Sequence, residues 1–186
     1  MGLLVALAIA VNLDGLVVHA DWRIGLKVKA HMTPRRTHLA QLIFSAGDPE
    51  VLIPLTVVAG VSIAVWRKSL LRGALIPTAV GVASAVSGAL KALLPSVRPA
   101  GWADQMHSFP STHTTATATL FGVVAVCAFL HWKQQNQALV FAALGAFAMA
   151  AACVLYRAHW PSDVLGGLLI ATATVATVRL VLLRHR

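Results

Sequence analysis

Residues 138–156 read ALVFAALGAFAMAAACVLY and contain no charged side chain. This length approaches the roughly 20 apolar residues that an α-helix needs to cross the hydrocarbon core of a bilayer. Further charge-free apolar runs occupy residues 1–13, 51–66, 73–90, 114–130 and 164–178. Inside lipid a segment must pair its own backbone N–H and C=O groups, so these runs predict helices.

The composition of the whole chain agrees with this pattern. Of its 186 residues, 58% are apolar and 11% are charged, and the mean hydropathy is +0.78. Soluble domains carry about 25% charged residues, so this composition excludes a soluble globular protein, a disordered chain and a disulfide scaffold. We expect residues 1–186 to form a single all-α, polytopic membrane domain with about six transmembrane helices. The first apolar run is short, and whether residues 1–20 span the membrane fully remains open.

A different pattern follows the first apolar run. Between residues 21 and 45, basic side chains such as Arg23, Lys27 and Arg36 alternate with apolar ones, and Pro34 interrupts the stretch. This pattern predicts an interfacial amphipathic helix, broken once, that lies on the lipid headgroups. A solvated loop is the alternative.

The charge balance is basic, with 15 Lys and Arg against 6 Asp and Glu and a net charge of +9. Because the cations are scattered between apolar runs, we expect no nucleic-acid partner, and anionic headgroups or a phosphorylated ligand explain them better. No Cys/His cluster has the spacing of metal ligands, and Cys127 and Cys153 both lie inside apolar runs. We therefore expect no metal. We also expect no cofactor, and the sequence predicts no protein partner.

Three polar clusters fall at the ends of apolar runs, on connecting segments that would share one membrane face. The first contains Lys91 and Arg98, with Pro95 ending the helix and Pro99 holding Arg98 in an extended segment. Two cations at this spacing suit a group with several anionic oxygens. The alternative is a pair of interfacial cations that anchor the end of a helix.

The second cluster is Pro110-Ser111-Thr112-His113, directly before an apolar run. Pro and Ser are typical of a helix start, and a helix N-terminus offers unpaired N–H groups to an anion. Ser111 could add its hydroxyl, and His113 could donate a proton to a departing oxygen. The alternative is ordinary N-capping beside an incidental histidine.

The third cluster contains His159 and Asp163 within Arg157-Ala-His-Trp-Pro-Ser-Asp. If a helix begins near His159, the two side chains lie one turn apart on the same face. Asp163 could then accept the Nδ1 proton and leave Nε2 of His159 as a nucleophile. The alternative is a structural His–Asp pair at the interface.

In order and spacing, the three clusters resemble the motifs of the type 2 phosphatidic-acid phosphatase superfamily of membrane lipid phosphatases. The family pattern is Lys, six residues, Arg-Pro; then Pro-Ser-Gly-His; then Ser-Arg, five residues, His, three residues, Asp. The first motif is complete, and the second has Thr112 in place of Gly. In the third, Ala152 and Cys153 replace Ser-Arg. The resemblance extends from about residue 50 to the C-terminus.

The resemblance implies six helices, an active site on the extracytoplasmic face and a reaction without a metal. It implies that His159 attacks phosphorus to form a phosphohistidine, that Asp163 orients it, and that His113 protonates the leaving group. The groups that would hold the phosphoryl oxygens are Lys91, Arg98, Ser111 and the backbone near Thr112.

Cys153 removes a charge-assisted phosphate contact that the family pattern provides. Arg157 lies four residues further on, so in a continuing helix its guanidinium could reach the same phosphate. We therefore also place Arg157 among the expected phosphate-binding residues.

Together these observations predict an integral membrane lipid phosphatase, expected in a bacterial plasma or inner membrane. The expected substrate is a membrane lipid phosphate: undecaprenyl diphosphate, phosphatidic acid or phosphatidylglycerol phosphate. One alternative is a membrane protein that binds lipid phosphates but has lost turnover, because of Cys153. Another is a small transporter or scaffold, in which the three polar clusters would not converge.

Overall fold

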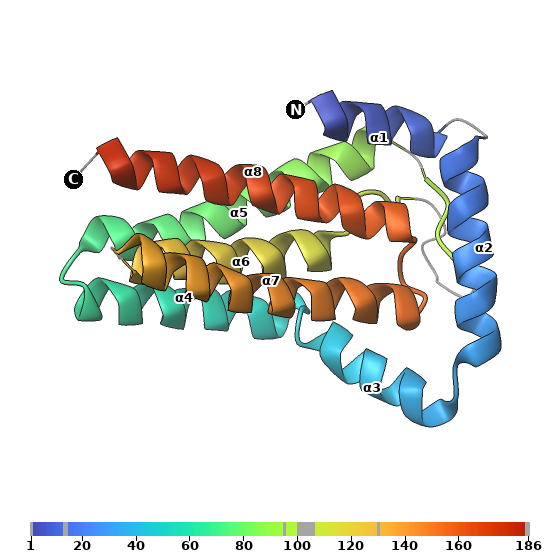
Figure 1. Cartoon of the computed structure of the whole chain (residues 1–186), viewed down its shortest axis with the longest axis horizontal. Coiled ribbons are helices and arrows are strands. Elements are labelled where there is room, and N and C mark those ends of the chain that lie inside the picture. Colours follow the sequence, from blue (N-terminus) through green and yellow to red (C-terminus); the bar gives the residue numbers. More distant parts are fainter. Residues whose placement is uncertain (1, 13–14, 95, 100–106, 130, 185–186) are drawn as a thin grey trace.

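The computed structural model describes residues 2–12, 15–94, 96–99, 107–129 and 131–184. Within these residues the chain is helical and contains no strand (Figure 1). The helices are α1 (Gly2–Asn12), α2 (Leu16–His31), α3 (Pro34–Ser45), α4 (Pro49–Trp66), α5 (Leu70–Leu93), α6 (Thr112–Ala128), α7 (Trp132–Leu155) and α8 (Pro161–Arg184). The predicted all-α fold class is confirmed.

The helices α4 to α8 run lengthwise beside one another and form a bundle (Figure 1). Among the described helices, α4, α5, α7 and α8 are each long and apolar enough to cross a membrane. The helix α6 is apolar but shorter, while α1 and α2 meet at 71° and satisfy the same test only as a bent pair. Among the described residues, four helices therefore qualify as spans, or five spans if the bent pair counts as one, and α6 is a shorter apolar helix beside them. The chain is a multi-pass integral membrane protein.

The centre of the bundle is α6, most of whose residues are buried. Leu120 and Val123 of α6 pack with Ile76 of α5 and Val178 of α8 in one apolar core. The outer helices, in contrast, expose large apolar side chains such as Phe141. An apolar exterior is what a bundle surrounded by lipid requires.

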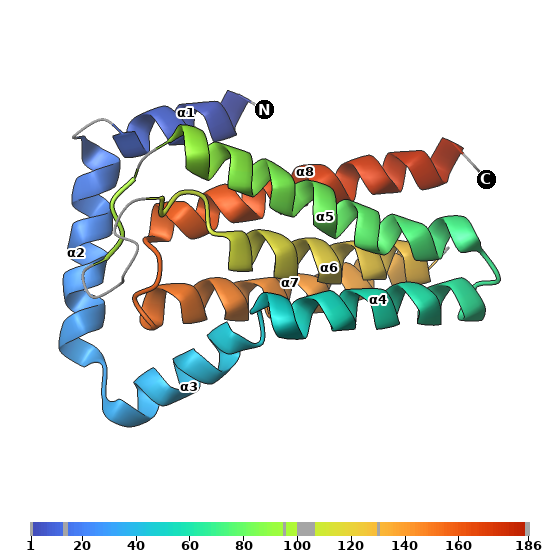
Figure 2. The same cartoon turned by 180° about the vertical axis from the view of Figure 1, so that it is seen from behind.

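The stretch predicted to be an amphipathic helix broken near Pro34 forms two helices, α2 and α3, and not a solvated loop. Its position on the lipid headgroups stays a prediction. Thr33 caps α3, and its hydroxyl accepts a hydrogen bond from the backbone N–H of Arg36 at 3.4 Å. Pro34 is the first residue of α3, where the missing N–H of a proline leaves no helical hydrogen bond unmade. The helix α2 crosses one end of the bundle at a steep angle to α4–α8 (Figures 1 and 2).

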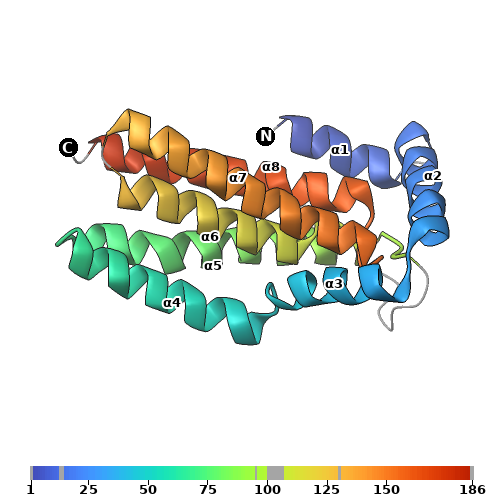
Figure 3. The same ribbon diagram turned by 60° about the horizontal axis from the view of Figure 1, so that its bottom comes forward.

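The three polar clusters lie at this same end of the bundle, as expected. The C-terminal ends of α5 and α7 and the N-terminal ends of α6 and α8 all meet there (Figure 2). The helix α3 follows one side of this end and leads directly into α4 (Figure 3). The corner between α3 and α4 therefore reaches the region of the polar clusters.

Candidate active site

His159 lies in a tight turn between α7 and α8. After α7 ends at Leu155, the backbone N–H groups of Ala158 and His159 both donate to the carbonyl of Cys153, at 3.0 and 3.2 Å. The helix α8 begins at Pro161, so His159 lies two residues before the helix and not in its first turn. Proline lacks an N–H and suits the first position of a helix, which explains the later start.

The side chains of His159 and Asp163 are nevertheless in contact. Nδ1 of His159 lies 3.3 Å from Oδ2 of Asp163, and both side chains are buried, at 1% and 0% exposure. Asp163 is in the first turn of α8, and its Oδ2 also accepts the N–H of Trp160 at 2.8 Å. Since Nδ1 faces the carboxylate, Nε2 is the ring nitrogen left for a ligand.

The environment of His159 favours the neutral imidazole. The pKa of His159 is lowered to about 4, chiefly by burial and also by the positive charges of Lys91 and Arg98, while Asp163 opposes the shift. Removing an ionisable group from water disfavours its charged form, so the ring carries a free lone pair at neutral pH.

Ser108 supports the same carboxylate, and the sequence analysis assigned it no role. Its hydroxyl donates to Oδ2 of Asp163. The segment before α6 that carries Ser108 is anchored, because the N–H of Ser108 donates to the carbonyl of Ser96 at 3.0 Å. The N–H of Phe109 also donates to Oγ of Ser96 at 2.6 Å. A serine three positions before the N-cap of α6 carries no sequence signal for this contact.

The N-terminus of α6 packs directly against the start of α8. The N–H of Ser111, the N-cap of α6, donates to the carbonyl of Asp163 at 3.0 Å. A Cβ atom on Gly167 would lie 2.8 Å from the carbonyl oxygen of Ser111. A Cβ atom on Gly166 would lie 2.6 Å from Cε2 of Phe109. The absence of a side chain at Gly166 and Gly167 therefore allows the start of α8 to pack closely against the start of α6.

The hydroxyl of Ser111 is occupied within the protein. It accepts the N–H of Thr114 at 3.3 Å and donates to Sγ of Cys153 at 3.8 Å. Thr114 donates to the same sulfur at 3.6 Å. Ser111 and Cys153 are fully buried, so a neutral thiol stands where the family pattern has an arginine.

The first cluster joins the third through Arg98. Its Nη1 donates to the carbonyl of Ala158 at 3.4 Å, directly before His159. Nearby, Nε1 of Trp160 donates to the carbonyl of Val97 at 2.6 Å. These contacts, with those of Ser108 and Ser111, bring all three clusters together. The convergence contradicts what the transporter or scaffold alternative expects.

His113 is enclosed by the corner between α3 and α4. Its Nε2 lies 3.0 Å from Oδ1 of Asp48. The ring of Phe44 stacks on the imidazole with centroids 4.1 Å apart and planes at 17°. A Cβ atom on Gly47 would lie 2.9 Å from Cδ2 of His113. Sequence reasoning missed these partners, because Asp48 before Pro49 reads only as a helix start.

A cavity of about 740 Å³, here called the site cavity, connects these residues. Its polar end is lined by Lys91, Arg98, Thr112, His113 and His159. The rest of the cavity runs between α4 and α5, where Leu52, Val57, Pro77 and Val80 give it an apolar lining. The site cavity can therefore hold an anionic group at its polar end and an apolar chain in the rest.

Three residues expected in the site do not line the cavity: Asp163, Ser111 and Arg157. Asp163 lies behind His159, and the hydroxyl of Ser111 faces Cys153. Arg157 lies beyond the end of α7 and has a φ of 61°, which is not helical. The expectation that α7 continues as a helix to Arg157 is therefore wrong.

The helix α2 holds the turn that carries His159. Asp21 accepts the N–H of Ser162 at 3.1 Å and also the hydroxyl of Ser162. The rings of Trp22 and Trp160 lie 5.4 Å apart, and a Cβ atom on Gly25 would lie 2.7 Å from Trp160. A carboxylate at a helix N-terminus satisfies its free N–H groups and its dipole, here from a distant segment.

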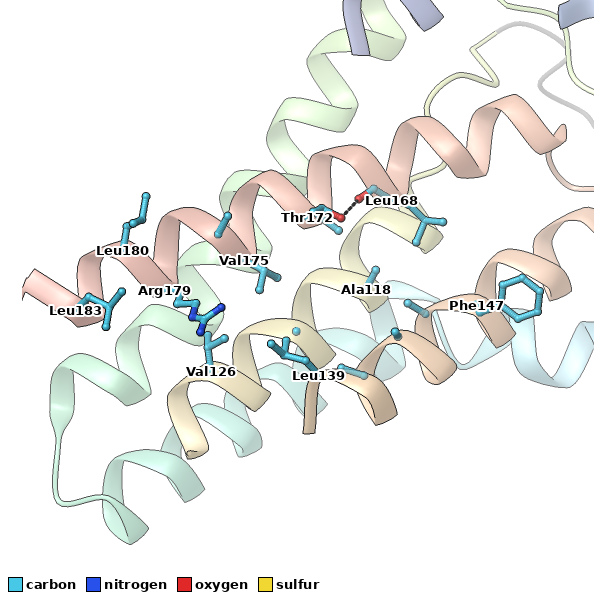
Figure 4. A pocket seen from close by; sticks show the side chains of 16 residues that line it. Ala118, Val126, Leu139, Phe147, Leu168, Thr172, Val175, Arg179, Leu180 and Leu183 are labelled. Carbon is cyan, nitrogen blue, oxygen red and sulfur yellow. Dashed lines mark hydrogen bonds between the residues drawn. The ribbon is translucent and has the colours of Figure 1, made fainter. Parts of the chain in front are cut away.

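A second large groove lies between α6, α7 and α8 (Figure 4). Its volume is about 770 Å³, and its lining is almost entirely small or aliphatic, with Arg179 near one end. None of the expected site residues lines it. The chemistry of the lining, and not the volume, therefore singles out the site cavity.

Comparison with known proteins agrees with this geometry. The model of the PAP2 superfamily matches residues 72–186, so the chain belongs to the PAP2 superfamily. The structure resembles a PAP2-type phosphatidylglycerolphosphate phosphatase from Bacillus subtilis, with a TM-score of 0.86 and 24% identity over 95% of this chain and 90% of that one. It also resembles LpxE of Aquifex aeolicus, with a TM-score of 0.66 and 19% identity over 84% of this chain and 93% of that one. No curated protein matches the sequence.

Proposed function

We propose that this protein is a lipid phosphatase that releases phosphate from a phosphomonoester or diphosphate on a membrane lipid, through a phosphohistidine intermediate. One observation carries the proposal: His159, backed by Asp163, lines the same cavity as Lys91, Arg98 and His113. Binding a phosphate would not by itself require a neutral, buried histidine with a carboxylate behind it.

In the first step, Nε2 of His159 attacks phosphorus and forms the N–P bond, while the bond from phosphorus to the leaving oxygen breaks. His113 gives its proton to that oxygen. In the second step, His113 takes a proton from water, whose oxygen attacks phosphorus. The N–P bond breaks, phosphate leaves and His159 is neutral again. Asp163 stabilises the positive charge that the ring carries between the two steps.

Fixed positive charges supply the electrostatic stabilisation in this proposal. Lys91 and Arg98 line the polar end of the site cavity, and Thr112 begins α6 there. The free N–H groups at the start of a helix and its dipole favour a phosphoryl group. Because these groups neutralise the phosphoryl oxygens, the proposed reaction uses no metal ion. Ser111 and Arg157 remain proposed contributors that only substitution can assign.

Asp48 completes the proposed machinery by positioning His113. The carboxylate of Asp48 and the stacked ring of Phe44 hold the imidazole in the wall of the site cavity. With Nε2 directed at Asp48, Nδ1 is the nitrogen that would exchange a proton with the leaving group and then with water. Burial favours the neutral ring of His113, and the hydrogen bond and charge of Asp48 oppose this effect and stabilise the protonated imidazole that the first step needs.

The apolar part of the site cavity supports a lipid substrate. An acyl or prenyl chain would lie between α4 and α5 while its phosphate contacts Lys91 and Arg98. Undecaprenyl diphosphate, phosphatidic acid and phosphatidylglycerol phosphate all combine these two parts. We further propose that the site faces the extracytoplasmic side of a bacterial plasma or inner membrane.

The test is phosphate release by the purified protein from these three lipids, in detergent and with EDTA. Wild type is expected to release phosphate, whereas His159→Ala is expected to release none. The control is His38→Ala, which removes an exposed histidine of α3 outside the site cavity. A phosphoenzyme that is labile in acid and stable in base would identify phosphohistidine. Release that needs an added metal ion would contradict the proposal.

Cys153 supports one alternative, a protein that binds lipid phosphates without turnover. Its neutral thiol takes the place of the family arginine and is fully buried. In that case the wild-type protein would bind the three lipids and release phosphate from none. Release that is abolished by His159→Ala would exclude this alternative.

A further inference from the structure

A groove of about 600 Å³, here called the elbow groove, lies where α2 and α3 meet the side of α7. One wall is apolar and is formed by α7, through Phe147, Ala148, Ala151, Ala152 and Leu155. The other wall carries Lys27 and His31 of α2 and Arg36 of α3. No residue that lines the site cavity lines this groove, so the two are separate.

The elbow between α2 and α3 keeps the basic side chains together. Nδ1 of His31 lies 2.8 Å from the carbonyl of Lys27, and Nη1 of Arg36 donates to the carbonyl of His31 at 2.8 Å. Arg36 uses one of its five N–H donors in this contact. The guanidinium is therefore held against the C-terminal end of α2, with donors left over for an anion.

The charge of the elbow groove is one-sided. Its described lining contains the basic residues Lys27, His31 and Arg36 but no aspartate or glutamate. A ligand that matches this groove must be anionic beside the elbow and apolar along α7. The wall from Phe147 to Leu155 extends about 12 Å along the helix axis. That length accommodates part of a hydrocarbon chain.

We propose that the elbow groove binds an anionic glycerophospholipid as a second lipid site. Its phosphate contacts Lys27, His31 and Arg36, and one acyl chain lies along α7. The elbow belongs to the amphipathic segment across the end of the bundle, where α2 crosses it (Figure 1). Headgroups and the basic side chains of such a segment meet at the same depth. A free phosphate would match the cations but not the apolar wall.

The test is native mass spectrometry of the detergent-solubilised protein, titrated with phosphatidylglycerol or with phosphatidylcholine of the same chains. Wild type is expected to bind one phosphatidylglycerol about 10-fold more tightly than phosphatidylcholine. The variant Lys27→Gln/Arg36→Gln is expected to lose this preference. The matched control is Lys29→Gln/Arg35→Gln, which removes two cations from the same helices but outside the groove. This control should keep the preference.

A second variant tests the apolar wall. Ala148 is exposed in the groove, so Ala148→Trp fills it without disturbing the core. We expect weaker binding of phosphatidylglycerol although every cation remains. Equal losses in the two charge variants would overturn the proposal in favour of diffuse surface attraction. Unchanged lipid binding in Ala148→Trp would overturn it in favour of a free-anion site. A dimer that depends on Lys27 and Arg36, without lipid preference, would overturn it in favour of self-association.

Discussion

Asp48 and His113 lie 3.0 Å apart, Oδ1 to Nε2, although 65 positions separate them in the chain. If Asp48 positions His113, Asp48→Asn should lower kcat about 10-fold and change KM little, because proton transfer depends on ring orientation. The measurement is steady-state phosphate release from a lipid phosphate. Burst-phase experiments would show which step has slowed.

The control for this substitution is Glu50→Gln. Glu50 is an exposed carboxylate in the first turn of α4, two positions beyond Asp48, and it does not line the site cavity. Its removal should leave kcat unchanged. Equal effects of the two substitutions would mean that Asp48 acts through general surface charge.

Ser108 gives a second prediction. Ser108→Ala removes one of the donors to the buried carboxylate of Asp163, and a hydrogen bond to a charged group is worth about 2 kcal/mol. We expect a lower melting temperature and a kcat reduced by about 10-fold. Ser69→Ala is the matched control, because it removes the N-cap hydroxyl of α5 far from the site. It should destabilise the protein but leave kcat intact.

The fold and the positions of the three clusters could be predicted because they depend on local patterns. Charge-free runs predict helices in lipid, Pro110-Ser111 directly precede α6, and Pro161 is the first residue of α8. The supporting contacts could not be predicted, because Asp21, Asp48 and Ser108 reach the site from distant segments. Each looks in sequence like an ordinary loop or helix-end residue. Their partners follow only from how α2, the α3–α4 corner and the segment before α6 fold against the end of the bundle.

The same distinction applies to the helical path by which Arg157 was expected to reach the phosphate. Its expected position assumed one more turn of α7, but the carbonyl of Cys153 accepts hydrogen bonds from Ala158 and His159 instead. Helix ends depend on such local closures, and spacing alone does not reveal them.

Gly167 gives a prediction about stability. Gly167→Ala would place a Cβ atom 2.8 Å from the backbone oxygen of Ser111, which cannot move without shifting the start of α6. We expect a loss of about 1–3 kcal/mol in the free energy of unfolding. The comparison is Gly88→Ala, whose Cβ atom would meet no described atom within 4 Å. A thermal melt in detergent measures both, and equal melting temperatures would contradict the close-packing argument.

The lowered pKa of His159 predicts a direction for pH dependence. The attacking form is neutral, so protonation of a group with a pKa of about 4 should limit kcat/KM only in acid solution. Lys91→Gln removes a charge that lowers this pKa, so the acid limb should move to higher pH, toward 6.5. The substrate titrates identically with both proteins, and comparing the two profiles removes its contribution. An unchanged acid limb would mean that another group limits the rate.

The pKa of His159 also makes stability depend on pH. An unfolded chain would protonate this histidine below about 6.5, whereas the folded protein resists protonation until about 4. The unfolded state therefore binds more protons in this window, and the contribution of His159 to stability is lost as the pH falls from 6.5 to 4. The melting temperature of wild type should fall more steeply across this window than that of His159→Gln.

Gly81 allows the apolar part of the site cavity to be tested without touching its polar end. Gly81 lines the cavity, and a Cβ atom there would meet no described atom within 4 Å, so Gly81→Leu should fold. The added side chain would occupy space proposed for the lipid chain. We expect KM for a long-chain lipid phosphate to rise about 10-fold, with hydrolysis of a short, water-soluble phosphomonoester within about 2-fold of wild type. Gly88 has equally open surroundings but lies outside the cavity. Gly88→Leu should therefore leave the hydrolysis of both substrates unchanged. If Gly81→Leu slowed both substrates alike, the groove between α4 and α5 would not be the place of the lipid chain.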